Sequence, residues 1–199
     1  MARIRHYSRR QRKVSGLEGR RWEMVYQFRG KAATGKTTLS NLLAERLSIP
    51  VIRKDDIVDA LKSSRNISKD SINNEVCYNI LYHIIQTNLD LHTDFILDIA
   101  LGDRKNAAAF FNRLDFGSNQ TVKFFVDCSD EQMWRRRHEE RLKSPLPHQS
   151  FQSIEQVMER YQRADVNPFD DEYIIDSANP VQACFDEILR LIGAAGEKR

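Results

Sequence analysis

Residues Gly30 to Thr37 read GKAATGKT, which satisfies the pattern GxxxxGK(S/T) of loops that bind phosphate groups. The glycines let the loop curl so that backbone N–H groups point inward, and the start of the following helix adds partial positive charge. We expect Lys36 to bridge the β- and γ-phosphates of a nucleoside triphosphate, most naturally ATP, and Thr37 to place its hydroxyl on Mg²⁺. The other residues expected around the phosphates are Gly30, Ala33, Thr34, Gly35 and Thr38.

Three aspartates follow short apolar stretches, where an α/β sheet presents side chains to ligands. The carboxylate of Asp55 could accept the proton of an acceptor hydroxyl, and its neighbour Asp56 could do so instead. The alternative for this pair is capping of the next helix, with either aspartate as the N-cap. Asp98 ends the stretch FILD and could hold Mg²⁺ through water or contact the acceptor, or it could simply form a turn.

The sequence WRRRHEER, predicted to be helical, holds four arginines with different surroundings. Arg135 and Arg136 each have a glutamate four residues on, which is ordinary pairing at a solvated surface. Arg137 and Arg141 share a face, where a bound anion would relieve their repulsion, so they are candidate phosphate clamps that close over a nucleotide and exclude water. The alternative for these two is a solvated face. Arg104, one turn past Asp98, could grip an anionic or hydroxylated acceptor.

The sequence predicts strands that alternate with helices, and these elements must position the residues named above. The predicted strands span residues 22–28, 50–52, 95–99, 121–126 and 173–175. One predicted helix follows the glycine loop, and two others end at Leu61 and at Leu114. The remaining predicted helices span residues 70–91, 129–143, 153–163 and 181–192. This alternation predicts an α/β fold with a mainly parallel sheet covered by helices on both faces, and the chemical residues at the carboxyl ends of its strands.

The helix predicted over residues 70–91 carries two neighbouring apolar rows. We expect both rows to form one broad stripe against the sheet. They comprise Ile72, Val76, Ile80 and Ile84, and Cys77, Leu81, Ile85 and Leu89.

Length and composition limit the class of protein. A chain of 199 residues with 41% hydrophobic content favours one domain around one core. No stretch has the roughly eighteen apolar residues that cross a bilayer, so we expect a soluble, cytoplasmic protein with no membrane span. Cys77, Cys128 and Cys184 lie far apart without a CxxC pair, which fits buried thiols in a reducing compartment rather than zinc. The histidines likewise share no metal-ligand spacing.

Residues 1–21 form a basic arm, with eight Lys or Arg residues against the single acid Glu18. The arm lacks apolar periodicity, so we predict that it is disordered and that a kinase-like domain occupies residues 22–199. The arm could bind nucleic acid or lipid, direct the chain to an organelle, or precede a start at Met24. It could also be a passive extension.

The residues outside the phosphate loop narrow the class of phosphate-binding protein. The guanine-reading tetrapeptide NKxD does not occur, and the chain is small for a ring-forming ATPase, which favours a small-molecule kinase. The chain resembles the P-loop kinase superfamily over residues 22–192, in the branch that groups AAA-domain kinase-like proteins with chloramphenicol phosphotransferase, zeta toxins and polynucleotide kinase domains. The segments that carry this resemblance are GKAATGKTT, KDDIVDAL, ILD and WRRRHEER.

The resemblance implies a three-layer P-loop NTPase fold with five strands in the kinase-like order 2-3-1-4-5 and a short lid. It also implies that Asp55 acts as a base or acceptor ligand, that Arg137 and Arg141 flank the phosphates, and that Asn179 and Pro180 border adenine. Relatives often have an arginine three residues after the motif aspartate, where this chain has Val58. That departure leaves the acceptor open.

Three functions are consistent with the sequence. The first is an ATP- and Mg²⁺-dependent kinase that phosphorylates a hydroxyl of a small molecule. The second is a polynucleotide 5′-hydroxyl kinase whose basic arm recruits the strand. The third is a regulatory protein that binds ATP without phosphorylating anything. The sequence leaves the preference for ATP over GTP, the acceptor and the oligomeric state open.

Overall fold

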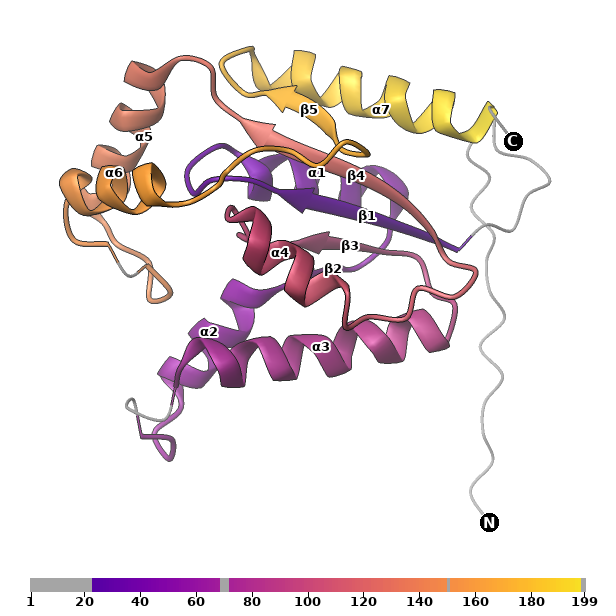
Figure 1. The fold of residues 1–199 in the computed structure, drawn as a ribbon, viewed down its shortest axis with the longest axis horizontal. Coiled ribbons are helices and arrows are strands. Elements are labelled where there is room, and N and C mark those ends of the chain that lie inside the picture. The colour runs from indigo at the N-terminus through magenta and orange to yellow at the C-terminus, as the bar shows by residue number, and fades with distance from the viewer. Residues whose placement is uncertain (1–22, 69–71, 150, 198–199) are drawn as a thin grey trace.

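The computed structural model describes residues 23–68, 72–149 and 151–197, so the basic arm and Trp22 lie outside the described part of the chain. Within these ranges, five strands alternate with helices (Figure 1). The strands are β1 (Met24–Arg29), β2 (Val51–Arg53), β3 (Phe95–Asp98), β4 (Gln120–Asp127) and β5 (Tyr173–Asp176). The helices are α1 (Lys36–Leu47), α2 (Lys54–Ser63), α3 (Asn74–Asp90), α4 (Arg104–Phe111), α5 (Glu131–Lys143), α6 (Ile154–Arg163) and α7 (Val181–Glu197). No helix in the described ranges is both long and apolar enough to span a bilayer.

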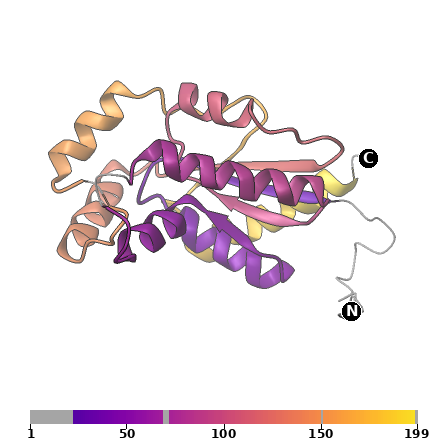
Figure 2. The same cartoon turned by 90° about the horizontal axis from the view of Figure 1, so that it is seen from below.

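The strands form one sheet in the order β2-β3-β1-β4-β5, and neighbouring strands run parallel. Helices α1 and α7 cover one face of the sheet, and α3 and α4 cover the other (Figures 1 and 2). The predicted three-layer α/β fold and the predicted strand order are therefore confirmed. Because parallel strands end at the same edge, the loops after β1, β2 and β3 come together there.

The central strands are buried on both faces, which explains their nearly continuous apolar sequences. Successive side chains of β1 alternate between the two faces. Tyr26 and Phe28 pack towards α1 and α7, whereas Val25 packs towards α3 and α4. The rings of Phe28 and Phe124 lie 5.1 Å apart on the α1 side. The sheet thus forms a rigid base below the loop that begins at Gly30.

Helix α3 packs by a narrower stripe than its sequence predicts. Cys77, Leu81, Ile85 and Leu89 are buried against the sheet, but Val76 and Ile84 are each 39% exposed. The expectation of one broad buried stripe was wrong, because residues at i and i+1 lie about 100° apart around a helix. The helix begins at Asn74, with the side chain of Asn73 accepting from the Val76 amide, and the predicted start at Asp70 lies outside the described residues.

Helix α2 corrects the predicted N-cap. Its N-cap is Arg53, in extended conformation and without a side-chain cap, and Asp55 and Asp56 lie in the first helical turn. Neither aspartate is therefore the N-cap. Their negative charge at this end still suits the helix dipole, which is the physical reason that acidic residues near helix starts are easily mistaken for caps.

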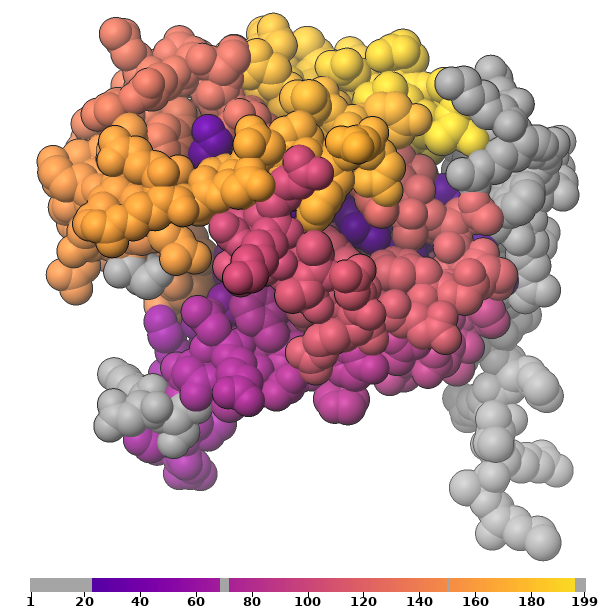
Figure 3. Space-filling view, viewed as in Figure 1, coloured from indigo at the N-terminus to yellow at the C-terminus, as the bar shows by residue number. Residues whose placement is uncertain are grey.

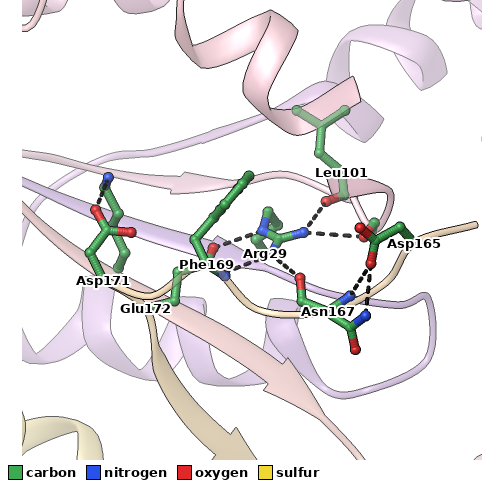
Figure 4. A network of polar contacts seen from close by, with 9 residues as sticks. Arg29, Leu101, Asp165, Asn167, Phe169, Asp171 and Glu172 are labelled. Carbon is green, nitrogen blue, oxygen red and sulfur yellow. Dashed lines mark hydrogen bonds and ion pairs between the residues drawn. The ribbon is translucent and has the colours of Figure 1, made fainter. Parts of the chain in front are cut away.

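Arg29, the last residue of β1, anchors the start of the glycine loop (Figure 4). Its buried guanidinium donates to both carboxylate oxygens of Glu172, at 2.7 and 2.6 Å, and to the carbonyls of Leu101 and Asn167. The ring of Phe169 lies 4.6 Å from its central carbon. A buried charge is stable only when it is paired and hydrogen-bonded, as here. The residue before Gly30 is thereby tied to the α6–β5 connection and to the loop after β3.

Replacing Gly30 by alanine should destabilise the fold. A Cβ at this position would meet the Val126 carbonyl oxygen at 2.1 Å, and the backbone has a φ of 139° that L-residues rarely adopt. We expect a loss of at least about 3 kcal/mol in the free energy of unfolding, measured by urea denaturation. Gly193→Ala in α7 is the control: nothing lies within 4 Å, so helix propensity should stabilise the protein by about 0.5–1 kcal/mol. Equal midpoints for the two variants would contradict this reading of Gly30.

Candidate active site

A cavity of about 770 Å³ opens at the carboxyl ends of the central strands. The cavity is lined by the glycine loop and the start of α1, by the starts of α2 and α3, by the loop after β3 together with α4, and by α5, α6 and their connecting loop. In the space-filling view, α5 and α6 stand at the same end of the molecule as α2 and the start of α3 (Figure 3). A volume of this size suits a phosphate chain together with a small second ligand.

The glycine loop has the curled backbone that its motif predicts. Ala33 and Gly35 adopt left-handed conformations, with φ of 61° and 89°. The Thr34 hydroxyl donates to the Lys31 carbonyl at 2.9 Å, and the Lys36 ammonium donates to the same oxygen at 2.5 Å. The ammonium group therefore lies against the inside of its own loop, where backbone N–H groups and positive charge together favour an anion.

The charged ammonium group of Lys36 lies in a buried environment that stabilises charge poorly. The side chain is buried, and burial lowers the pKa of its ammonium group to about 8, with nearby Arg141 acting in the same direction. The carboxylates of Asp98, Asp55 and Asp127 oppose this effect. A polyphosphate beside Lys36 would favour the charged form far more strongly.

Asp98 and Thr37 line the cavity next to Lys36. The carboxylate of Asp98, at the end of β3, accepts from the Ser40 hydroxyl at 3.0 Å and from Arg53 Nε at 3.1 Å. The described residues contain no group of three or more His, Cys, Asp or Glu side chains that could hold a metal by themselves. Mg²⁺ is commonly held by one or two protein oxygens, with water and phosphate oxygens completing its shell. Thr37 and Asp98 fit a magnesium ion bound in this way.

The two aspartates of α2 have different surroundings. Asp55 lines the cavity and its side chain is 41% exposed. Asp56 lies outside the cavity lining, is 65% exposed, and faces Arg53 with an N–O distance of 3.8 Å. Of the two alternatives for the acceptor base, Asp55 is the one that the geometry favours.

Hydrogen bonds to Ala32 connect helices α5 and α6 to the glycine loop. Trp134 Nε1 donates to the Ala32 carbonyl at 2.8 Å, and the Ala32 amide donates to the Tyr161 hydroxyl at 2.7 Å. The two aromatic rings pack edge to face with centroids 5.6 Å apart. The two helices are therefore positioned relative to the phosphate loop, as a lid over phosphates requires.

The lid arginines separate into two kinds. Arg141 lines the cavity, whereas Arg137 lies off it and donates to the hydroxyl and carbonyl oxygens of Ser177, at 2.9 and 2.8 Å. Arg135 pairs with Glu131, one turn earlier, rather than with the glutamate four residues on. That expectation was wrong because a helix offers each arginine partners on both sides. Of the four arginines of WRRRHEER, Arg141 is the one in the cavity lining.

Other candidate residues lie outside the cavity lining. The Arg104 guanidinium lies 5.0 Å from the centre of the Phe169 ring. Asn179 and Pro180 are exposed on the turn after β5, where the Asn179 side chain donates to the Asp176 carbonyl at 3.1 Å. The remaining loop residues also lie off the lining: Gly30 and Thr34 are buried within the loop, and Thr38 is exposed on α1.

Several cavity residues escaped the sequence analysis. Lys54 donates to Asn74 Oδ1 at 2.7 Å and lies 4.8 Å over the Tyr78 ring. Arg160 reaches the cavity from α6, and His148 reaches it from the loop between α5 and α6. Lys54 begins the segment KDDIVDAL, which the sequence analysis singled out, and could have been found from it. The other two had no local signal, because only the tertiary fold brings α6 and its preceding loop opposite α2.

His138 also lines the cavity, although the sequence suggested no role for it. The side chain is buried beneath Trp134, with ring centroids 4.9 Å apart. Burial lowers the pKa of its imidazole to about 4, and the positive charge of Arg141 acts in the same direction. The ring is therefore neutral at physiological pH and contributes packing without adding charge to the phosphate side of the cavity.

Comparison with known families matches residues 25–164 to a family described as an AAA domain. Comparison with curated protein sequences finds no significant match. Three similar solved structures are a proposed kinase from Chloroflexus aurantiacus (TM-score 0.67, 18% identity, 84% of this chain and 97% of that chain), a gluconokinase from Sinorhizobium meliloti 1021 (0.61, 18%, 90% and 97%) and a sugar kinase from Janibacter sp. HTCC2649 (0.58, 13%, 87% and 96%). At these identities the likeness is one of fold.

Proposed function

This chain belongs to the AAA domain family within the P-loop kinase-like superfamily, and on that premise we propose that it is an ATP- and Mg²⁺-dependent kinase of a small hydroxylated compound. One observation carries the proposal. Lys36, Thr37 and Asp98 line the same cavity as Asp55, so a candidate phosphate site and a candidate acceptor base share one cavity.

Transfer follows from these positions. The acceptor O–H bond breaks, its proton passes to the Asp55 carboxylate, and the oxygen forms a bond to the γ-phosphorus as the bridging bond to ADP breaks. Lys36 and Arg141 stabilise the negative charge on the transferring group. Bound with the nucleotide at Thr37 and Asp98, Mg²⁺ would neutralise phosphate charge. The protein's contribution is positioning, electrostatic stabilisation and exclusion of water.

We call the part of the cavity that α2, α3 and α4 line the acceptor half. Its side chains support a small polyhydroxylated acceptor, such as a sugar or sugar acid. Amide side chains both donate and accept hydrogen bonds, as hydroxyl groups require, and Asn74, Asn79 and Asn106 line this half. Arg113, which donates to Asn79 Oδ1 at 3.1 Å, offers its remaining N–H groups to a carboxylate. The sugar kinase and the gluconokinase that share this fold lend further support.

The same half of the cavity gives little support to a nucleic acid acceptor. Proteins that bind single strands stack bases on open aromatic rings. The Tyr78 ring is covered by Lys54 at 4.8 Å and packs against Phe110 at 5.4 Å. The basic arm, on which a polynucleotide function would depend, lies outside the described residues.

The test is a measurement of ADP release with Mg²⁺ and ATP across sugars, sugar acids, nucleosides and 5′-hydroxyl oligonucleotides. We expect acceptor-dependent ADP release with a member of the first two classes, and its loss on chelation of Mg²⁺ with EDTA. Stimulation by oligonucleotides alone would replace this function by polynucleotide phosphorylation. Tight ATP binding without turnover of any acceptor would favour the regulatory alternative.

A further inference from the structure

The loop between α5 and α6 is docked on one face of α2. His148 Nδ1 lies 2.9 Å from Asp59 Oδ2, and His148 Nε2 lies 3.6 Å from Asp55 Oδ2. One turn further on, Lys62 Nζ donates to the Pro147 carbonyl at 2.7 Å. Asp55, Asp59 and Lys62 are spaced four and three residues apart, which places them along one side of the helix. Each of these α2 residues thus meets the loop.

Asp59 fixes the direction of the imidazole ring. A carboxylate only accepts hydrogen bonds, so the 2.9 Å contact places a proton on Nδ1 and turns Nε2 towards Asp55. The other oxygen of Asp59, Oδ1, is buried and has no hydrogen-bond partner in the described part of the chain. His148 therefore stabilises this carboxylate. In return, Asp59 orients the ring of His148, as the third group of a catalytic triad orients its histidine.

The distance between His148 Nε2 and Asp55 Oδ2 allows one hydroxyl group to contact both atoms. A separation of 3.6 Å is too long for a direct hydrogen bond, so the Asp55 oxygen remains able to accept. A hydroxyl oxygen can lie about 2.7–2.9 Å from both atoms, because two such contacts meeting at an angle span 3.6 Å. Asp55 and His148 both line the cavity, whereas Asp59 is not part of its lining.

We infer that His148, oriented by Asp59, is a further catalytic residue that holds the acceptor hydroxyl together with Asp55. His148 donates to Asp59 through Nδ1 and turns Nε2 to the acceptor hydroxyl, whose proton passes to Asp55 as its oxygen attacks the phosphorus. This inference rests on the proposed function. It makes the acceptor site complete only when the loop is docked, which couples acceptor binding to closure of the lid.

The docking is tested first, without any activity. We compare amide hydrogen exchange at Gln149, whose N–H donates to the Leu146 carbonyl at 2.9 Å, between the native protein and Asp59→Ala. Loss of the charge-assisted contact should speed exchange roughly tenfold or more. Asp186→Ala is the matched control, because Asp186 is an exposed helical aspartate that bonds only to Gln182 on its own helix among the described residues. Unchanged exchange in Asp59→Ala would overturn the role of Asp59.

The catalytic role is tested with His148→Ala and His148→Gln. We expect His148→Ala to lower kcat/KM for the acceptor roughly 100-fold with unchanged ATP affinity, and His148→Gln, whose amide can still hydrogen-bond to the hydroxyl, to recover part of the loss. His83→Gln, on the exposed side of α3, should behave as the native protein. Acceptor phosphorylation by His148→Ala at the native rate would overturn the inference alone. ATP binding by the native protein without transfer to any acceptor would instead remove the proposed function, and the role of His148 with it.

Discussion

Lys36→Ala is expected to reduce the rate of phosphoryl transfer about 1,000-fold, because it removes the buried ammonium group that stabilises negative charge on the phosphoryl group during transfer. Lys36 is buried within the curled loop, with Nζ 2.5 Å from the Lys31 carbonyl. Initial rates of ADP release with a true acceptor measure the loss. Lys143→Ala, which removes an exposed lid lysine paired with Glu140, is the matched charge control and should retain nearly full activity.

The same prediction has a pH signature that a merely structural lysine would lack. Burial lowers the pKa of Lys36 to about 8, so in the free protein this group loses its proton as the pH rises above 8. A bound polyphosphate favours the charged form, so binding above pH 8 must take up a proton and nucleotide affinity must fall as the pH rises further. Calorimetry in two buffers of different ionisation enthalpy should detect this uptake in the native protein and not in Lys36→Ala. Equal uptake by both proteins would contradict the assignment.

The sheet was predictable because its determinants are local. Each strand of the described chain is a short apolar run between turn residues, and the alternation with helices restricts the topology to a few choices. The resemblance to P-loop kinases then supplied the order 2-3-1-4-5, which the structure confirms. The predicted stripe on α3 went wrong because apolar content does not tell which of two adjacent rows meets the sheet. That choice depends on how α3 is rotated against the sheet, which no local pattern encodes.

The candidate site likewise contains residues that local patterns identified and residues whose positions depend on the whole fold. Lys36, Thr37 and Asp98 were identified from patterns that include their own strand or loop, and they line one cavity. Arg137 was chosen from helix periodicity and from the resemblance to P-loop kinases, and in the structure it is hydrogen-bonded to Ser177 and lies off the cavity lining. A helical face is readable from sequence, but the rotation of a helix relative to a cavity is not. Contacts such as that between His148 and Asp59, 89 residues apart, depend on the whole fold.

Asp55→Asn is expected to lower kcat for the true acceptor between about 100- and 10,000-fold while leaving ATP affinity nearly unchanged. Asparagine has almost the same shape but cannot take the hydroxyl proton, so the change isolates proton transfer from packing. Asp55 lies in the first turn of α2 and lines the cavity, opposite the phosphate loop that holds Lys36. Rapid-mixing measurements of a single turnover would separate the chemical step from product release.

Asp56→Asn is the comparison that decides between the two aspartates. It removes the same charge from the same helical turn, but Asp56 is 65% exposed, faces Arg53 and lies outside the cavity lining. An exposed ion pair of this kind contributes little, so transfer should remain within a few-fold of the native rate. If Asp56→Asn abolished transfer and Asp55→Asn did not, the acceptor would have to approach from the Arg53 side of α2. His148 would then contact the wrong carboxylate, and the hydroxyl site inferred between Asp55 and His148 would fall with the base assignment.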